Sequence, residues 1–186
     1  MEKAEHTILG IDPGTNVMGY ALLRTHLRNS EIVTLNVVRM TKLPDQNSKL
    51  RMIYDSTAEL IQIYKPDILA IEEPFFGKNP QSMLKLGRAQ GVVIGACLHA
   101  GLEVFEYTPR RIKQSITGKG GASKEQVAAM LHHMYDFDNE TKYLDATDAL
   151  AAAVCHHLQN RVDFGNGKNN SWATFIAQHQ DRIIQK

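Results

Sequence analysis

Two aspartates stand three residues apart in LDATDAL, residues 144–150, within a run that is otherwise mostly alanine and leucine. Residues three apart on a helix share a face, so Asp145 and Asp148 are expected to project together. Two like charges that close repel each other, and burial beside the neighbouring alanines raises the cost. A positive partner is therefore expected, and the helix itself offers no Lys or Arg before Arg161. A bound cation is the stronger candidate.

Two further acids stand where strands are predicted to end. Asp12 closes the apolar run TILGID, and Glu72 closes ILAIE with Glu73 directly after it. Acids at strand ends beside helices are well placed to converge in an α/β domain. Successive strand residues face opposite ways, so only one of Glu72 and Glu73 can face a common site while the strand stays extended.

A set of carboxylates without thiolate or imidazole suits a hard ion such as Mg²⁺ or Mn²⁺. Four such acids can hold two ions about 4 Å apart. The chemistry that such a pair performs is in-line attack of water on a phosphodiester, with one ion activating the nucleophile and the other stabilising the leaving oxygen. The spacing of the acids therefore predicts metal-dependent phosphodiester hydrolysis.

The surrounding pattern predicts an α/β fold. Three apolar runs, at 7–12, 18–23 and 31–40, have the pattern of strands and are predicted to form an antiparallel three-strand meander. Helical spacing at 50–64 and 80–100 precedes the strands 68–73 and 102–107, as in parallel additions to a sheet. Ser123 and Gln126 form a capping-box signature for a helix through 135, and a last helix is predicted over 143–159.

A basic segment follows the fifth predicted strand. No acid interrupts it, and it contains Arg110, Arg111, Lys113, Lys119 and Lys124. Its glycine-rich loop GKGGAS, residues 118–123, has backbone amides that no side chain obstructs, and it is expected to move. The loop does not match the GxxxxGK[ST] phosphate loop, so an NTP site there is excluded.

Composition and length bound the class of protein. With 186 residues, 43% of them hydrophobic and 22% charged, the chain suits one globular domain. No run approaches the roughly 18 apolar residues of a membrane span, and no secretory signal begins the chain, so a cytoplasmic location is expected. Residues 1–160 are predicted to form the domain, and 161–186 a linker and short tail that could be helical.

Cysteine and histidine usage does not favour a zinc site. Cys97 and Cys155 lie far apart in apolar helical pattern, which suits reduced, buried thiols. The adjacent pairs at 132–133 and 156–157 point about 100° apart on a helix and do not converge on one ion. Both pairs are interpreted as histidines on helix surfaces.

With these residues in hand, the sequence resembles the RuvC family of bacterial Holliday-junction resolvases. The segments that carry the resemblance, in family order and spacing, are GIDPGTNVMGYAL, AIEEPFF, SMLKLGRAQGV and LDATDALAAAVCHH. They cover about residues 7–160. The resemblance implies an RNase H-like fold, a five-stranded mixed sheet flanked by helices, working as a homodimer. It also implies that Asp12, Glu72, Asp145 and Asp148 form the metal-binding catalytic set, which selects Glu72 over Glu73.

The resemblance also assigns DNA contacts. Phe75 matches an aromatic position that stacks on bases at the junction centre, although a buried core phenylalanine is an equal alternative. Lys113 and Lys124 match basic positions implicated in cleavage or phosphate binding. The expected function is paired, symmetric nicking of four-way DNA junctions in recombination and repair, with Mg²⁺ as cofactor, Mn²⁺ as a substitute and a branch-migration motor as partner.

Two alternatives stay open at the level of sequence. An actin-like or sugar-kinase ATP-binding domain also opens with Asp-x-Gly-Thr, but it needs two related domains and a second glycine-rich nucleotide loop, for which the chain is too short. A non-catalytic junction-binding module would leave the four acids without a task.

Overall fold

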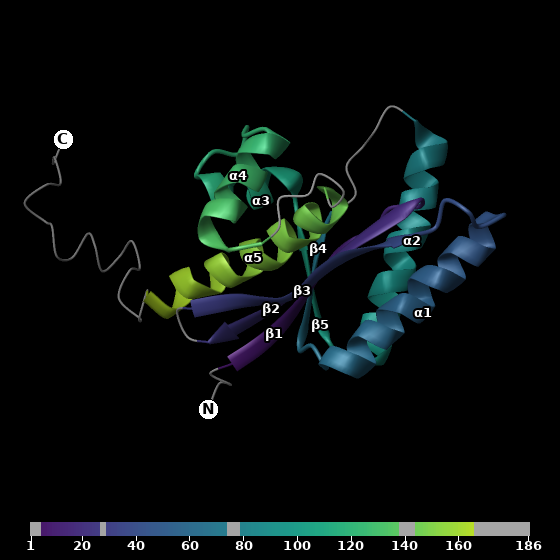
Figure 1. Cartoon of the computed structure of the whole chain (residues 1–186), viewed down its shortest axis with the longest axis horizontal. Coiled ribbons are helices and arrows are strands. Elements are labelled where there is room, and N and C mark those ends of the chain that lie inside the picture. The colour runs from purple at the N-terminus through teal and green to yellow at the C-terminus, as the bar shows by residue number, and fades with distance from the viewer. Residues whose placement is uncertain (1–4, 27–28, 74–78, 138–143, 166–186) are drawn as a thin grey trace, which may run out of the picture.

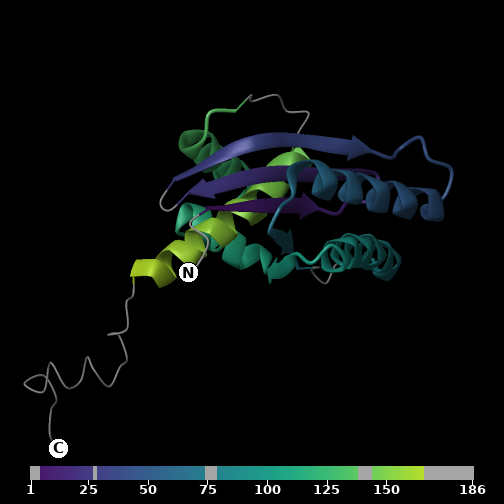
Figure 2. The ribbon, with the colours of Figure 1, turned by 90° about the horizontal axis from the view of Figure 1, so that it is seen from below.

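The computed structural model describes residues 5–26, 29–73, 79–137 and 144–165. Its centre is one five-stranded sheet in the order β3-β2-β1-β4-β5, of which the three N-terminal strands are seen side by side in Figure 2. The strands are β1 (Glu5–Asp12), β2 (Val17–His26), β3 (Asn29–Arg39), β4 (Ile68–Glu72) and β5 (Glu103–Tyr107). The first three pair antiparallel, and β4 and β5 add in parallel, which confirms the predicted mixed sheet.

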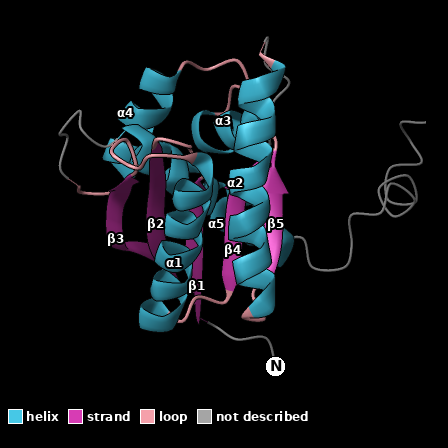
Figure 3. Ribbon diagram, turned by 90° about the vertical axis from the view of Figure 1, so that its right-hand side faces the viewer, coloured by secondary structure: helices cyan, strands magenta, loops and turns pink. Residues whose placement is uncertain are grey.

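Helices cover both faces of the sheet (Figure 1, Figure 3). They are α1 (Gln46–Tyr64), α2 (Pro80–His99), α3 (Pro109–Thr117), α4 (Lys124–Met134) and α5 (Leu144–Gly165). One core lies between the sheet and α1 with α2, and it includes Leu9 and Ile11. The other lies between the sheet and α3, α4 and α5, and it includes Ile8. Strand residues therefore alternate between two buried faces, as their near-continuous apolar runs require.

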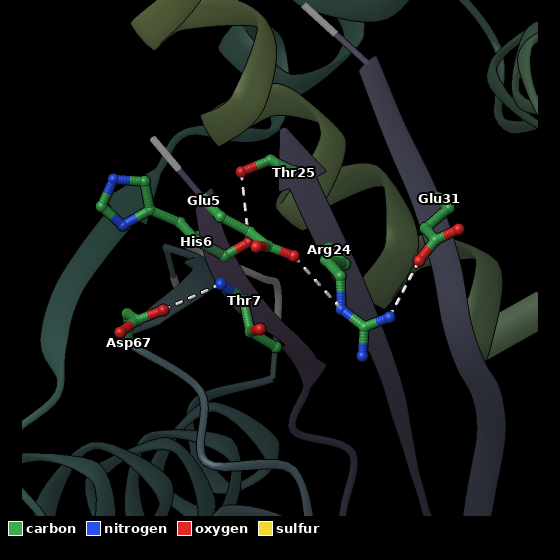
Figure 4. Close-up of polar contacts among 7 residues, drawn as sticks. All are labelled: Glu5, His6, Thr7, Arg24, Thr25, Glu31 and Asp67. Carbon is green, nitrogen blue, oxygen red and sulfur yellow. Dashed lines mark hydrogen bonds and ion pairs between the residues drawn. The ribbon is translucent and has the colours of Figure 1, made fainter. Parts of the chain in front are cut away.

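Polar contacts hold the strands together where β1 begins, at the opposite end of this strand from Asp12 (Figure 4). The backbone N–H of Thr7 donates to the carboxylate of Asp67 at 2.9 Å, just before β4 begins. Arg24 on β2 donates to Glu31 on β3 at 2.9 Å, and its Nε lies 3.9 Å from Glu5 on β1. These contacts link β1 to β4 and β2 to both of its neighbours. They support the strand register that determines where the strands end.

The structure contains a helix, α3, that the sequence analysis did not predict. Thr108 caps it by accepting from the N–H of Arg111 at 3.2 Å, and Pro109 is its first residue. Ile112 and Ile116, four residues apart, are its buried positions. Thr at the cap, Pro at the first position and this apolar spacing are all signals of a helix. The basic residues between them made the segment resemble a charged loop.

Helix α5 crosses the sheet diagonally (Figures 1 and 2), and its residues 149–157 are all buried. It runs to Gly165, past the predicted end near 159 and into the predicted linker. His156 and His157 are buried, so the prediction of surface histidines is wrong for this pair, whereas His133 is exposed. Cys97 and Cys155 are buried and free, as predicted. Among the described helices, none combines the length and apolar character needed to cross a membrane.

Candidate active site

Asp12 and Glu72 end neighbouring parallel strands at the same edge of the sheet. The last register pair between β1 and β4 is Ile11 with Ile71, so the two acids follow side by side. By alternation, Asp12 shares the face of Ile8, and Glu72 shares the face of Ala70, both of which pack toward α5. Glu73 has the opposite parity and follows the strand, with its N–H donating to the Tyr107 carbonyl at 2.9 Å. Glu72, and not Glu73, therefore lies on the face of the sheet that carries Asp12.

A tight turn directly follows Asp12. The N–H of Gly14 donates to the Asp12 carbonyl at 3.0 Å, and a Cβ at Gly14 would collide with the carbonyl of Val17. The chain can therefore reverse into β2 only with glycine at this position. The turn leaves Asp12 at the very end of its strand, facing the start of α5.

Two glycines in the sheet determine how close α5 can come. A Cβ at Gly10 on β1 would collide with the carbonyl oxygen of Ala149, and a Cβ at Gly19 on β2 would collide with that of Asp145. The helix backbone therefore lies directly on the strands. This close approach brings the first turns of α5, with Asp145 and Asp148, to the strand edge that carries Asp12.

The electrostatics show that the acids lie close together. Burial first, and then the charges of Asp148, Asp145 and Glu72, raise the pKa of Asp12 to about 7, with Lys124 opposing them. Burial also raises the pKa of Glu72, with Asp148 adding to the effect and Lys124 and Lys113 opposing it. Four carboxylates from β1, β4 and α5 thus share one region of unfavourable negative charge. Asp12, Glu72, Asp145 and Asp148 are brought together as the sequence predicted.

The positive partner of the paired aspartates comes from another helix. The Nζ of Lys124, at the start of α4, donates to Oδ2 of Asp148 at 2.6 Å. This ion pair, together with the nearby charges of Asp12 and Glu72, raises the pKa of Lys124. The pattern of α5 alone does not predict this contact, because the two partners are 24 positions apart in sequence and lie on different helices.

The donor set fits a hard divalent ion in its chemistry. All four side chains offer carboxylate oxygens, and one ammonium does not balance their charge. Within the described residues, no three His, Cys, Asp or Glu side chains are arranged so that they could hold an ion as they stand. Binding therefore requires these carboxylates to turn toward one ion.

The predicted DNA contacts fall into two groups. Lys113 and Lys124 lie close enough to the acids for their charges to act on Glu72, and Lys119 is exposed on the α3–α4 connection. Arg110 and Arg111 instead line a separate hollow of about 450 Å³, together with Thr108, Gln114, Ser115 and Gln159. Phe75 lies outside the described residues.

The glycine-rich connection between α3 and α4 is held at both ends. Gly118 has φ of 74° and ends α3 by donating to the Gln114 carbonyl at 2.9 Å. Ser123 forms the predicted capping box with Gln126, and Ala122, directly before Ser123, is buried. The structure thus shows a compact turn that fixes the start of α4, where Lys124 lies.

Gln90 is a buried polar residue that the sequence interpretation did not single out. Its amide, on α2, donates to the Glu106 carboxylate at 2.8 Å and to the backbone carbonyl of Glu72 at 3.5 Å. It therefore ties α2 to the end of β4. The signal in the sequence was a polar residue next to Ala89 and near Val93, on the apolar face of a helix, where a buried polar group needs hydrogen-bond partners.

Comparison with known proteins gives consistent matches. The profile of the family described as "Crossover junction endodeoxyribonuclease RuvC" matches residues 8–156. Proteins of that description from Cytophaga hutchinsonii and Christiangramia forsetii are 49% and 47% identical, covering 96% and 97% of this chain and 88% and 94% of theirs. A solved structure, "T. thermophilus RuvC in complex with Holliday junction substrate", is 28% identical with a TM-score of 0.78, covering 85% of this chain and 96% of that one. The predicted RNase H-like fold is confirmed.

Proposed function

Since the chain belongs to the RuvC family of crossover junction endodeoxyribonucleases, we propose that it resolves four-way DNA junctions by hydrolysing one phosphodiester bond in each of two symmetry-related strands. The observation that carries the proposal is the convergence of Asp12, Glu72, Asp145 and Asp148 from β1, β4 and α5. A junction-binding module without activity would have no use for such an unfavourable cluster.

The four carboxylates are proposed to hold Mg²⁺, two ions per site, with Mn²⁺ able to substitute. When bound, the metal activates the attacking water and stabilises the leaving oxygen. The chain's own contribution is positional. The strand ends fix the backbone of Asp12 and Glu72, and the glycine contacts of α5 fix the backbone of Asp145 and Asp148, so only the carboxylates need to turn toward the ion.

Basic side chains are proposed to bind the DNA backbone. Lys113 and Lys119 stand beside the carboxylates and on the neighbouring turn, where they can neutralise phosphates near the cut. Arg110 and Arg111 line the hollow at the start of α3 and would contact a more distant phosphate. Phe75 is proposed to stack on junction bases, from the family resemblance alone.

A homodimer is proposed to present one site to each strand. Large apolar side chains are exposed on α1 and α2, which lie on the same face of the sheet: Met52, Tyr54, Ile63, Leu84, Leu86 and Leu98. On α2, Gly87, Gly91 and Gly95 follow one another at helical spacing, and an added Cβ would meet nothing within 4 Å. An open, apolar helix surface of this kind suits close contact with a second copy. Family membership further suggests a branch-migration motor as partner.

The test is cleavage of a synthetic mobile four-way junction with and without Mg²⁺, compared with a linear duplex of the same sequence. The expected result is paired nicks in opposite strands, only with the ion and only in the junction. Asp148→Asn is expected to lower the rate of cleavage by at least about 10², the effect of losing a group that stabilises the transition state. Junction binding should be retained. Binding without cleavage by the unchanged protein would instead favour the non-catalytic alternative.

A further inference from the structure

Lys124 is held in position by its own helix terminus. It is the first residue of α4, directly after Ser123, which caps the helix through a reciprocal pair of hydrogen bonds with Gln126. The backbone of Lys124 is thereby fixed, and the side chain reaches from α4 across to α5. The resulting contact with Asp148 is a short, charge-assisted hydrogen bond of 2.6 Å.

The ammonium of Lys124 sits where the carboxylate cluster favours a cation. Its charge acts on Asp12 and Glu72 as well as on Asp148. Three acids from three elements therefore share the charge of Lys124, and Lys113 adds a second positive charge near Glu72. The same oxygen that accepts from Lys124 belongs to a residue that the proposed function assigns to the metal, so the ammonium and a divalent ion compete for it.

We propose that Lys124 stands in for the metal in the free protein, and that a divalent ion binds by displacing its ammonium from Asp148. This inference rests on the proposed function, because it takes Asp148 as a metal ligand. The Lys124 side chain is 72% exposed, compared with 27% for Asp148, so the ammonium can swing into solvent without disturbing the fold. Once displaced, it is free to contact a DNA phosphate at the same edge of the sheet.

Competition of this kind has two consequences. The free protein tolerates its acidic cluster without an ion, because one of the acids is neutralised. Metal binding becomes weaker than four carboxylates alone would give, because each binding event must break the ion pair. Since exposed ion pairs contribute little, the expected penalty is modest, and removal of the ammonium should tighten metal binding by about threefold to fivefold.

The test compares Mn²⁺ affinity, in the absence of DNA, between the unchanged protein and Lys124→Met, using the electron paramagnetic resonance signal of free Mn²⁺. Methionine keeps the length and apolar stem of the side chain but removes the charge. Lys119→Met is the matched control, since Lys119 precedes α4 on the same connection with an exposed side chain. We expect a gain of about threefold to fivefold for Lys124→Met and a change within about twofold for Lys119→Met, as for an exposed, screened charge.

A second measurement follows the ammonium itself. The rate at which an amine-reactive reagent labels Lys124, measured by mass spectrometry, is expected to rise when Mg²⁺ is added, while that of Lys119 stays constant. Unchanged Mn²⁺ affinity in Lys124→Met, or unchanged labelling of Lys124, would overturn the stand-in role while leaving the proposed nuclease function intact. If the unchanged protein binds no Mn²⁺, or binds it as tightly as Asp12→Asn does, the proposed metal-dependent function and this inference both fail.

Discussion

Burial acts on two titratable residues of this protein with opposite consequences for acid stability. Burial and neighbouring carboxylates raise the pKa of Asp12 to about 7, so protonation of Asp12 favours the folded state as the pH falls. His156 is buried against Phe105 and Tyr107, with its Nδ1 2.7 Å from the Tyr107 hydroxyl. Burial first, and then the charges of His6 on β1 and His157 on α5, lower the pKa of His156 to about 4.

The lowered pKa predicts that His156 makes the fold sensitive to acid. The folded state binds the proton with a pKa of about 4 and the unfolded state with about 6.5, so the stability it contributes is complete above pH 6.5 and is lost as the pH falls toward 4. The loss is up to about 3 kcal/mol. His156→Gln should lack this part of the pH dependence.

The measurement is the free energy of unfolding in urea between pH 4.5 and 7.5 for both proteins. The difference between them is informative because Asp12 contributes equally to each. Parallel curves for the two proteins would show that His156 is not protonated on unfolding in this range.

At the scale of elements, the sequence predicted most of what positions the site. Strand periodicity, the capping box at Ser123 and the acids at the ends of β1 and β4 are local signals, and each was confirmed. What could not be predicted depends on packing between distant segments. The burial of His156 and His157 follows from α5 crossing the sheet, and the Lys124–Asp148 pair follows from α4 lying beside α5. The functional roles of the site residues remain predictions.

The close approach of α5 predicts that Gly19 cannot be enlarged. Gly19→Ala places a methyl group on the backbone carbonyl of Asp145, which cannot move without shifting the start of α5. We expect a loss of stability of about 1–3 kcal/mol, as for overpacked cores, and a loss of cleavage larger than the loss of folded protein, because both aspartates move with the helix.

The matched control for this change is Gly121→Ala. Gly121 is exposed, and an added Cβ there meets nothing within 4 Å, so the change in stability should stay within about 0.5 kcal/mol. Urea unfolding and junction cleavage at equal folded concentration separate the two effects. Full stability of Gly19→Ala would mean that α5 lies farther from β2 than the structure shows.

At the scale of the whole molecule, the site lies at one edge of the sheet and the apolar surface of α1 and α2 on one of its faces. Helix α2 begins at Pro80, soon after β4 ends at Glu72, and Gln90 ties the two together. A two-fold axis at α2 would therefore relate two sites whose separation is set by rigid elements. A four-way junction has the same two-fold symmetry, so such a dimer would offer each carboxylate cluster one of two equivalent strands.

This arrangement predicts that a charge on the open face of α2 separates the subunits. Gly91→Glu places a carboxylate between Gly87 and Gly95 on α2, where a second copy would have to bury it. Folding should not suffer, because glutamate favours an exposed helix over glycine by about 0.5–1 kcal/mol. Gly121→Glu, which adds the same charge away from α2, is the control. In analytical ultracentrifugation we expect dimers for the unchanged protein and the control and single chains for Gly91→Glu, with paired nicks replaced by independent ones. A Gly91→Glu protein that remains dimeric would place the subunit contact elsewhere.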